Sequence, residues 1–359
     1  MRVLFVTHQM AFNINGGAEI QIANTMRSLN SIDASCHTKA FNPWEDRIQD
    51  FDIMHIFNPL SFPTESLTMA RFAIENKVRV AVSPIYFQSD EMRMDLQSKR
   101  LHGSLWKSAI LFRPLIVRNK LLQYLDPYHD FSRLLEIADA ILPNTEAEMN
   151  SLKSHFKHIG DSQLELVPNG VNHSFADGNP SLFKQEYGIC DFVLYVGRIE
   201  KRKNILRLIR AFSNTELETS LVIIGKAHDD LYLSLCKKES DERTLFLPAV
   251  PHDSPMLKSV YKCAKVFALP SYYETPGLAA LEAGLAGANI VITARGGTRE
   301  YFGEYARYID PLDRSDIEKA LIEQYKSPRK SNLSEHISKN FTWEIVAAKT
   351  LNVYHEMLA

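Results

Sequence analysis

The sequence predicts an α/β protein with two doubly wound parallel sheets, one in each half of the chain. Three observations lead to this fold class. Short runs of β-branched and other apolar residues alternate with helix-like stretches throughout, as expected of βαβ units. The length of 359 residues exceeds one ordinary hydrophobic core and suits two domains. Each half also contains enough strand-like runs for a sheet of its own.

The expected strands are apolar runs that polar or turn residues bound on each side. In the first half they are residues 2–7, 53–57, 78–83 and 140–143. In the second half they are residues 192–196, 220–225, 244–247, 266–269 and 290–293. Because a polar, turn-rich stretch over residues 172–179 separates the two sets, we expect domains over residues 1–172 and 173–340.

Residues 341–359 have the pattern of an amphipathic helix. Thr342 is a suitable N-cap. The residues expected near its apolar face are Trp343, Val346, Ala347, Leu351 and Tyr354. We expect a terminal helix that packs on the core.

Composition restricts the partner and the compartment. Hydrophobic residues make up 45% and charged residues 23% of the chain, which is ordinary for a globular protein. A net charge of -2 gives no indication of a nucleic-acid partner. No signal-peptide pattern and no membrane-spanning apolar run is present, so a cytoplasmic protein is expected. The cysteines (Cys36, Cys190, Cys236 and Cys263) are widely spaced, and we expect free thiols rather than a disulfide or metal site.

Residues 99–124 mix six Lys and Arg residues with Trp106, Phe112 and many aliphatic side chains. A basic amphipathic stretch of this kind can lie on an anionic membrane surface, which would make the protein peripheral at the inner face of a membrane. A core helix with a basic solvent face explains the pattern equally well. Pro114 would break or kink a single helix there.

The most informative segment contains Glu274 and Glu282, two carboxylates that seven residues separate. The first lies in the loop after the expected strand 266–269, and the second lies inside the helix that follows. Pro276 suits the first helical turn, and Gly277 permits close approach to the backbone. The free amides of that helix N-terminus suit a phosphate. The segment therefore predicts a ligand with a central diphosphate and a hydroxyl-rich sugar at each end.

In each half, a glycine-containing turn follows the first expected strand. Gly197 precedes Arg198 and Lys203, whose charges suit a diphosphate, although a solvated charged loop has the same composition. Gly16 and Gly17 precede a helix-like run but lack the G-x-G-x-x-G spacing, which disfavours a nicotinamide cofactor.

Taken together, the motifs resemble those of a family 4 glycosyltransferase with the GT-B architecture. The motifs that carry the resemblance are Gly16-Gly17-Ala18-Glu19, Val167–Val171, Gly197-Arg198 with Lys203, Pro270-Ser271 with Glu274 and Glu282, Gly296-Gly297 with Glu300, and the Phe341-Thr342-Trp343 helix start. The resemblance implies two Rossmann-like domains facing across a cleft, with a final helix that crosses back to the N-terminal domain. It also implies a nucleotide-sugar donor, retention of the anomeric configuration, and neither a metal nor a separate cofactor.

The same resemblance implies roles for individual residues. Arg198 and Lys203 would stabilise the leaving diphosphate, and Glu274 would contact the donor sugar. Glu282 would accept hydrogen bonds from the ribose hydroxyls. Further donor contacts are implied for Gly16, Gly17, Gly197, Thr275, Pro276, Gly277 and Leu278.

The acceptor side departs from the family pattern. Many relatives have a His-Asp pair where this chain reads Ser83-Pro-Ile-Tyr-Phe87, so Tyr86 is the candidate for that space. His8, at the end of the first strand, and Asn169 are the other acceptor-side candidates. The acceptor expected from the resemblance is a glycan, a lipid-linked glycan or a small molecule.

Two rival functions stay open at this point. A catalytically idle protein that binds a nucleotide sugar or a protein partner would have the same fold, and the missing His-Asp pair is compatible with it. An NAD-dependent oxidoreductase is disfavoured by the glycine spacing.

Overall fold

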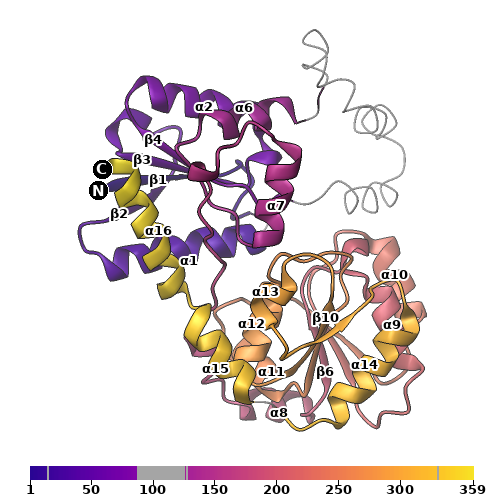
Figure 1. Cartoon of the computed structure of the whole chain (residues 1–359). Helices are drawn as coiled ribbons and strands as arrows, with labels where there is room; N and C mark the ends of the chain where they lie inside the picture. The colour runs from indigo at the N-terminus through magenta and orange to yellow at the C-terminus, as the bar shows by residue number, and fades with distance from the viewer. Residues whose placement is uncertain (14–15, 87–125, 127, 330) are drawn as a thin grey trace. The chain divides into compact units, whose positions relative to one another are not determined.

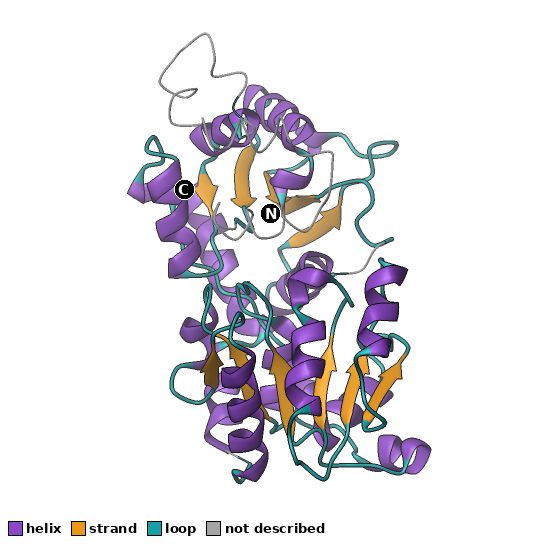
Figure 2. Ribbon diagram, turned by 90° about the vertical axis from the view of Figure 1, so that its right-hand side faces the viewer, coloured by secondary structure: helices purple, strands orange, loops and turns teal. Residues whose placement is uncertain are grey.

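The computed structural model describes residues 1–13, 16–86, 126, 128–329 and 331–359 (Figure 1). The chain forms two compact units. Unit 1 comprises residues 1–169 and 343–359, and unit 2 comprises residues 170–342. Each unit is a parallel sheet with helices on both faces, as Figure 2 shows.

The sheet of unit 1 has the strand order β2-β1-β3-β4-β5, with every pair parallel. Its strands are β1 (Arg2–Val6), β2 (His37–Ala40), β3 (Ile53–Phe57), β4 (Arg79–Ser83) and β5 (Ala140–Ile141). Because β1 leads outward to β2 and β3 leads to β4 on the other side, the direction of winding reverses between β1 and β3. Such a switch point is where open parallel sheets bind ligands.

Helices cover both faces of the unit 1 sheet, and among the described residues α1 pairs with α16 and α2 with α6. The helices described are α1 (Gly17–Ile32), α2 (Pro63–Glu75), α6 (His129–Ile137), α7 (Glu146–His155) and α16 (Trp343–Leu358). Helix α16 packs along α1 although they are far apart in the sequence (Figure 1). Helix α2 packs on α6, over a core that includes Leu4, Val6 and Phe131.

The sheet of unit 2 has the order β11-β10-β9-β6-β7-β8 and is also parallel throughout. Its strands are β6 (Val193–Val196), β7 (Leu221–Ile224), β8 (Thr244–Leu247), β9 (Val266–Leu269), β10 (Asn289–Thr293) and β11 (Arg307–Ile309). The four strands from β7 through β6 and β9 to β10 are almost continuously buried, which explains their unbroken apolar sequences.

Helices cover both faces of this sheet. They are α8 (Ser181–Tyr187), α9 (Ile205–Ser213), α10 (Asp230–Lys238), α11 (Pro255–Cys263), α12 (Leu278–Leu285), α13 (Thr298–Phe302), α14 (Arg314–Lys326) and α15 (Ser331–Asn340). Helices α9, α10 and α14 pack together, whereas α8, α11, α12 and α15 form another connected group. The α/β fold with two Rossmann-like halves that the sequence predicts is therefore confirmed.

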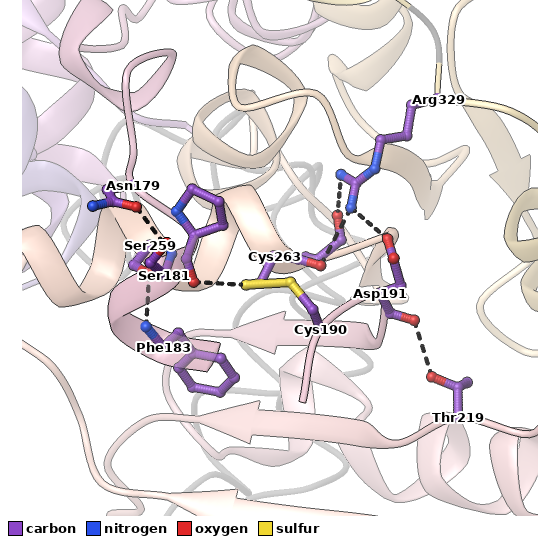
Figure 3. The surroundings of a disulfide bond; sticks show 11 residues. Asn179, Ser181, Phe183, Cys190, Asp191, Thr219, Ser259, Cys263 and Arg329 are labelled. Atoms are coloured by element: carbon purple, nitrogen blue, oxygen red, sulfur yellow. Dashed lines mark hydrogen bonds and ion pairs between the residues drawn. A yellow bond between two sulfur atoms is a disulfide. The ribbon is translucent and has the colours of Figure 1, made fainter. Parts of the chain in front are cut away.

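One prediction about the cysteines is wrong. Cys190 and Cys263 form a disulfide, while Cys36 and Cys236 are free and buried. The bond joins the segment before β6 to the last residue of α11 (Figure 3). Arg329 strengthens the same region, since it pairs with Asp191 at 2.8 Å and donates to the Ala264 carbonyl at 2.6 Å. A sequence separation of 73 residues gives no local spacing signal, so only the fold reveals the pairing.

We expect reduction of this disulfide to lower the free energy of unfolding of unit 2 by about 2–4 kcal/mol, because the loop that it closes is long. Urea unfolding with and without dithiothreitol measures the change. A Cys190→Ala/Cys263→Ala variant should unfold at the lower urea concentration and no longer respond to the reductant. An identical unfolding midpoint of the wild-type protein in both conditions would contradict the prediction.

None of the helices in the described part of the chain combines the length and apolar character that a membrane span requires. The basic stretch over residues 99–124, for which the sequence predicts a peripheral membrane contact, lies outside the described residues.

Candidate functional site

The candidate site of unit 2 lies where the winding of its sheet reverses. From the central β6–β9 pair, β7 and β8 follow on one side and β10 and β11 on the other. The β6–β9 ladder includes only Val193–Val266 and Leu194–Phe267, whereas β6 pairs with β7 along its full length. The carboxyl ends of β6 and β9 are therefore not joined to each other, and the loops that leave them contain the predicted site residues.

The loop after β6 begins with a glycine that no other residue could replace without strain. Gly197 has φ +151°, and a Cβ there would lie 2.9 Å from the Tyr195 hydroxyl oxygen. That hydroxyl donates to the Arg198 carbonyl at 2.8 Å, which fixes the next residue. The Arg198 side chain is exposed, and it makes no hydrogen bond or ion pair within the described parts of the chain. Its guanidinium is available to an anion.

Lys203 and Glu274 form a buried ion pair between the two loops. The Lys203 ammonium lies 2.5 Å from Oε1 of Glu274, and the side chains are 16% and 9% exposed. Burial acts to raise the pKa of Glu274, but the charges of Lys203 and Arg202 outweigh it and lower that pKa. Burial also lowers the pKa of Lys203, against the opposing effect of Glu274. The pair joins the ends of β6 and β9, and two N–H donors of the ammonium remain for a further acceptor.

Glu274 is positioned by backbone contacts to the loop after β10. Its amide donates to the Arg295 carbonyl, and its own carbonyl accepts from the Gly297 amide at 3.1 Å. Gly296 has φ +95°, and a Cβ there would lie 2.0 Å from the Glu274 carbonyl oxygen. A side chain at position 296 would therefore displace Glu274.

The segment between Glu274 and α12 lies at a helix N-terminus. Thr275, Pro276 and Gly277 are buried, and Leu278 is partly exposed. Gly277 is the N-cap residue and has φ +73°. The Gly277 carbonyl accepts from the amides of Ala280 and Leu281. The amides of Leu278 and Ala279 precede these bonds, and a phosphate or sugar hydroxyl oxygen can accept from such amides at a helix N-terminus.

Glu282 lies within α12 and is only 5% exposed. Its Oε2 accepts from the Tyr261 hydroxyl at 2.7 Å, and its Oε1 lies 2.5 Å from Nε2 of His252. Unit 2 thus brings together the loop after β6, the loop after β9 and helix α12, which contain the site residues named from the sequence.

In unit 1, the predicted glycines lie at the N-terminus of α1, after β1. Gly16 is the N-cap residue, and Gly17 begins the helix. His8 follows the carboxyl end of β1, with its Nε2 3.4 Å from Oε1 of the buried Glu19. These residues therefore lie together near the switch point of the unit 1 sheet.

Tyr86 is not placed for contact with an acceptor. It is 1% exposed, its amide donates to Glu148 at 2.7 Å, and its hydroxyl lies 2.9 Å from Nδ1 of His155. Its ring packs among aromatic side chains of the core. The prediction that Tyr86 lines the acceptor side is corrected accordingly, because an aromatic side chain after a central strand gains more from burial than from exposure.

Ser83 and Asn169 are also buried. Ser83 lies 2.9 Å from Nε2 of His55, and Nδ1 of His55 lies 2.7 Å from the Tyr354 hydroxyl. Burial lowers the pKa of His55 to about 3, so this imidazole is neutral and structural. Asn169, 4% exposed, is the last residue of unit 1 before unit 2 begins.

Sequence reasoning missed three residues that shape the unit 2 site. His252 and Tyr261 hold Glu282, and Asn204 donates to the carbonyls of Pro270 and Pro311 at 3.0 and 2.7 Å. Asn204 has φ +59°, a conformation that Asn tolerates better than most residues. A Lys-Asn dipeptide before a helix gave a local signal for Asn204, but nothing in the sequence relates His252 to a residue 30 positions away.

Within the described residues, no group of three or more His, Cys, Asp and Glu side chains is arranged to hold a metal ion.

The chain has two Rossmann-like halves, and its structural neighbours are glycosyltransferases of the GT-B fold class. The fold is shared with sucrose-phosphate synthase from Thermosynechococcus elongatus, with a TM-score of 0.74, 16% identity and 99% coverage of both chains. It is also shared with Anabaena HepE, solved in complex with UDP-glucose, with a TM-score of 0.68, 13% identity, and coverage of 100% of this chain and 98% of that one.

More particularly, residues 185–342 match the family model of glycosyl transferases group 1. Among curated proteins, an uncharacterized glycosyltransferase of Methanocaldococcus jannaschii is 29% identical over 54% of each chain. The O-antigen chain mannosyltransferase B of Escherichia coli is 27% identical over 61% of each. These two matches thus span little more than half of the relatives' lengths. A D-inositol 3-phosphate glycosyltransferase of Corynebacterium diphtheriae is 24% identical over 94% of this chain and 89% of its own.

Proposed function

We propose that the protein is a retaining, family 4 glycosyltransferase. It moves a sugar from a nucleotide-diphosphate sugar to a hydroxyl acceptor without a metal ion. The acceptor is a glycan, a lipid-linked glycan or a small molecule, which makes the reaction a step of polysaccharide or glycoconjugate biosynthesis. The match of residues 185–342 to group 1 glycosyl transferases supports sugar transfer. The shared fold of HepE, which was solved with UDP-glucose, supports a nucleotide-sugar donor.

The observation that carries the proposal is the arrangement of charges at the β6–β9 switch point. Arg198 presents an exposed guanidinium that has no partner among the described residues, and the largely buried ammonium of Lys203 lies in the same loop. The neighbouring loop supplies Glu274 and leads into the amide-bearing N-terminus of α12. Cations and helix amides suit a diphosphate, and carboxylates suit sugar hydroxyls.

In the proposed reaction, the acceptor hydroxyl oxygen bonds to the anomeric carbon of the donor sugar while the bond from that carbon to the phosphate oxygen breaks. The electron pair leaves with the nucleoside diphosphate. The acceptor proton passes to a phosphate oxygen on the same face of the sugar, which gives retention. Arg198 and Lys203 stabilise the negative charge that develops on the diphosphate, and Glu274 accepts from sugar hydroxyls.

Thermal stabilisation by UDP, GDP, ADP and NAD, measured without added metal, tests the donor site. A nucleotide at 100 times its dissociation constant should stabilise the protein by about 2.7 kcal/mol. One nucleoside diphosphate should give a clear shift, and its sugar derivative should then release that diphosphate when acceptors are added in the presence of EDTA. A shift with NAD alone would overturn the proposal, and an inverted anomer in the product would refute retention.

A catalytically idle nucleotide-sugar or partner-binding protein is the second candidate. The observation that favours it is the burial of Ser83 and Tyr86, where many relatives have an acceptor-side His-Asp pair. This function predicts nucleotide binding with no sugar transfer to any acceptor and no slow hydrolysis of the bound donor.

A further inference from the structure

Two side chains determine how the buried carboxylate of Glu282 points. Tyr261, from α11, donates its hydroxyl hydrogen to Oε2 at 2.7 Å. His252, from the loop after β8, places Nε2 2.5 Å from Oε1. Because Glu282 itself belongs to α12, three separate elements fix this one side chain.

The two contacts leave a defined pair of acceptor positions. Each carboxylate oxygen offers about two lone-pair directions. One direction on Oε1 faces His252, and one on Oε2 faces Tyr261. The remaining directions, one on each oxygen, suit two neighbouring hydroxyl donors, such as the 2′- and 3′-hydroxyls of a ribose.

We propose that His252 and Tyr261 are positioning residues that hold Glu282 for a vicinal diol, and that His252 does so most strongly when its imidazole is protonated. This inference rests on the proposed function, and it takes for Glu282 the contact to the ribose hydroxyls that the family resemblance implies. It adds His252 and Tyr261 to the donor site, and it adds a pH dependence of ribonucleotide binding. The spacing of Glu274 and Glu282 in the sequence predicts neither.

The charges around His252 favour the protonated imidazole. Burial acts to lower the pKa of His252, but the hydrogen bond and charge of Glu282, with the charge of Asp253, raise it above its usual value. Asp253 lies 3.3 Å from Nδ1 of the same ring. Helix α11 contributes Tyr261, whose pKa burial and Glu282 raise well above the usual value, so it remains a donor. The Lys258 ammonium of α11 lies 6.0 Å from the ring centre of Phe175, which packs edge-on to His252.

The sign of the pH effect follows from this raised pKa. Below it, His252 is a cation, and its hydrogen bond to the Glu282 carboxylate also joins two opposite full charges. As the pH rises through it, the neutral imidazole can still donate to the carboxylate, but the attraction between the two charges is lost and the carboxylate is held less firmly. Affinity for a ribonucleotide should therefore decrease over this pH range.

The test compares UDP, GDP and ADP with their 2′-deoxy counterparts by calorimetry, from about pH 6 to about pH 9. The wild-type protein should bind its preferred ribonucleotide about tenfold more tightly than the deoxy form, a ratio that narrows as pH rises. His252→Ala should lose most of this preference at low pH. His252→Gln, which keeps a neutral donor, should retain part of the preference but show no pH dependence. Tyr261→Phe should lower the preference for the ribonucleotide at every pH, while the change of that preference with pH should stay as in the wild-type protein.

His228→Ala is the matched control, because it removes an exposed histidine from the loop after β7. It should change neither the ratio of ribo- to deoxynucleotide affinity nor the dependence of that ratio on pH. The inference is overturned if His252→Ala and His252→Gln keep the wild-type ratio and slope. A wild-type protein that binds ribo- and deoxynucleotides equally overturns the inference alone. A wild-type protein that binds no nucleotide overturns the proposed function together with it. Unfolding temperatures of all variants show whether a loss of binding reflects a loss of fold.

Discussion

Replacing Arg198 by alanine is expected to lower the rate of sugar transfer by about 10²-fold to 10³-fold, as for the loss of one preorganised group that stabilises transition-state charge. The unfolding temperature should stay at the wild-type value, because the side chain is exposed and has no partner within the described residues. Steady-state kinetics with the preferred nucleotide sugar and a thermal melt measure the two quantities.

Lys201 provides the matched control for Arg198. It is an exposed cation of the same loop, and its one ion pair to a described residue is a long one of 3.7 Å to Asp229, so Lys201→Ala should leave transfer and stability unchanged. Arg198→Lys should recover part of the activity, since it keeps the charge but loses the bidentate fork. Wild-type turnover in Arg198→Ala would remove this residue from the proposed reaction.

Replacing Lys203 by methionine is expected to reduce both stability and transfer. The change leaves the Glu274 carboxylate buried without its nearest cation, and breaking such a pair typically costs about 3–5 kcal/mol. Arg202, with NH1 4.0 Å from Glu274, offsets part of this loss. Urea unfolding gives the change in the free energy of unfolding.

A double variant separates the two effects of Lys203. Lys203→Met with Glu274→Gln removes both charges and should recover most of the stability, while transfer stays lost because neither group can act on the donor. Recovery of transfer along with stability would show that the pair is structural only.

Among the described residues, the sequence predicts every central strand but only two of the four edge strands, β5 and β8. Nine strands form within two residues of their expected ends, because buried parallel strands have continuous apolar sequences. The two that were not predicted, β2 and β11, are edge strands. The sequence of β2 is His-Thr-Lys-Ala, mostly exposed, and neighbouring β1 determines its conformation. A polar edge strand carries no periodic apolar signal.

In the candidate site, the sequence predicts the residues that follow a strand but not the contacts between distant segments. Arg198, Lys203, Glu274 and the start of α12 could be placed from sequence, because each directly follows a recognisable strand. His252 meets Glu282 because the loop after β8 lies against α12, and Cys190 meets Cys263 because the end of α11 lies beside the segment before β6. Local sequence contains neither arrangement. Tyr86 was misplaced because the sequence does not show which side of the backbone an aromatic residue after β4 faces.

The division of unit 1 into residues 1–169 and 343–359 has a consequence for the order of events during synthesis. All of unit 2 is synthesised before α16, so the core of unit 2 can begin to form while unit 1 still lacks a helix. Until then α1 is uncovered on the side that α16 will occupy, and the buried His55 lacks its Tyr354 contact. The N-terminal segment is thus the last part to reach its native state, which makes the nascent chain most dependent on protection from aggregation over its first half.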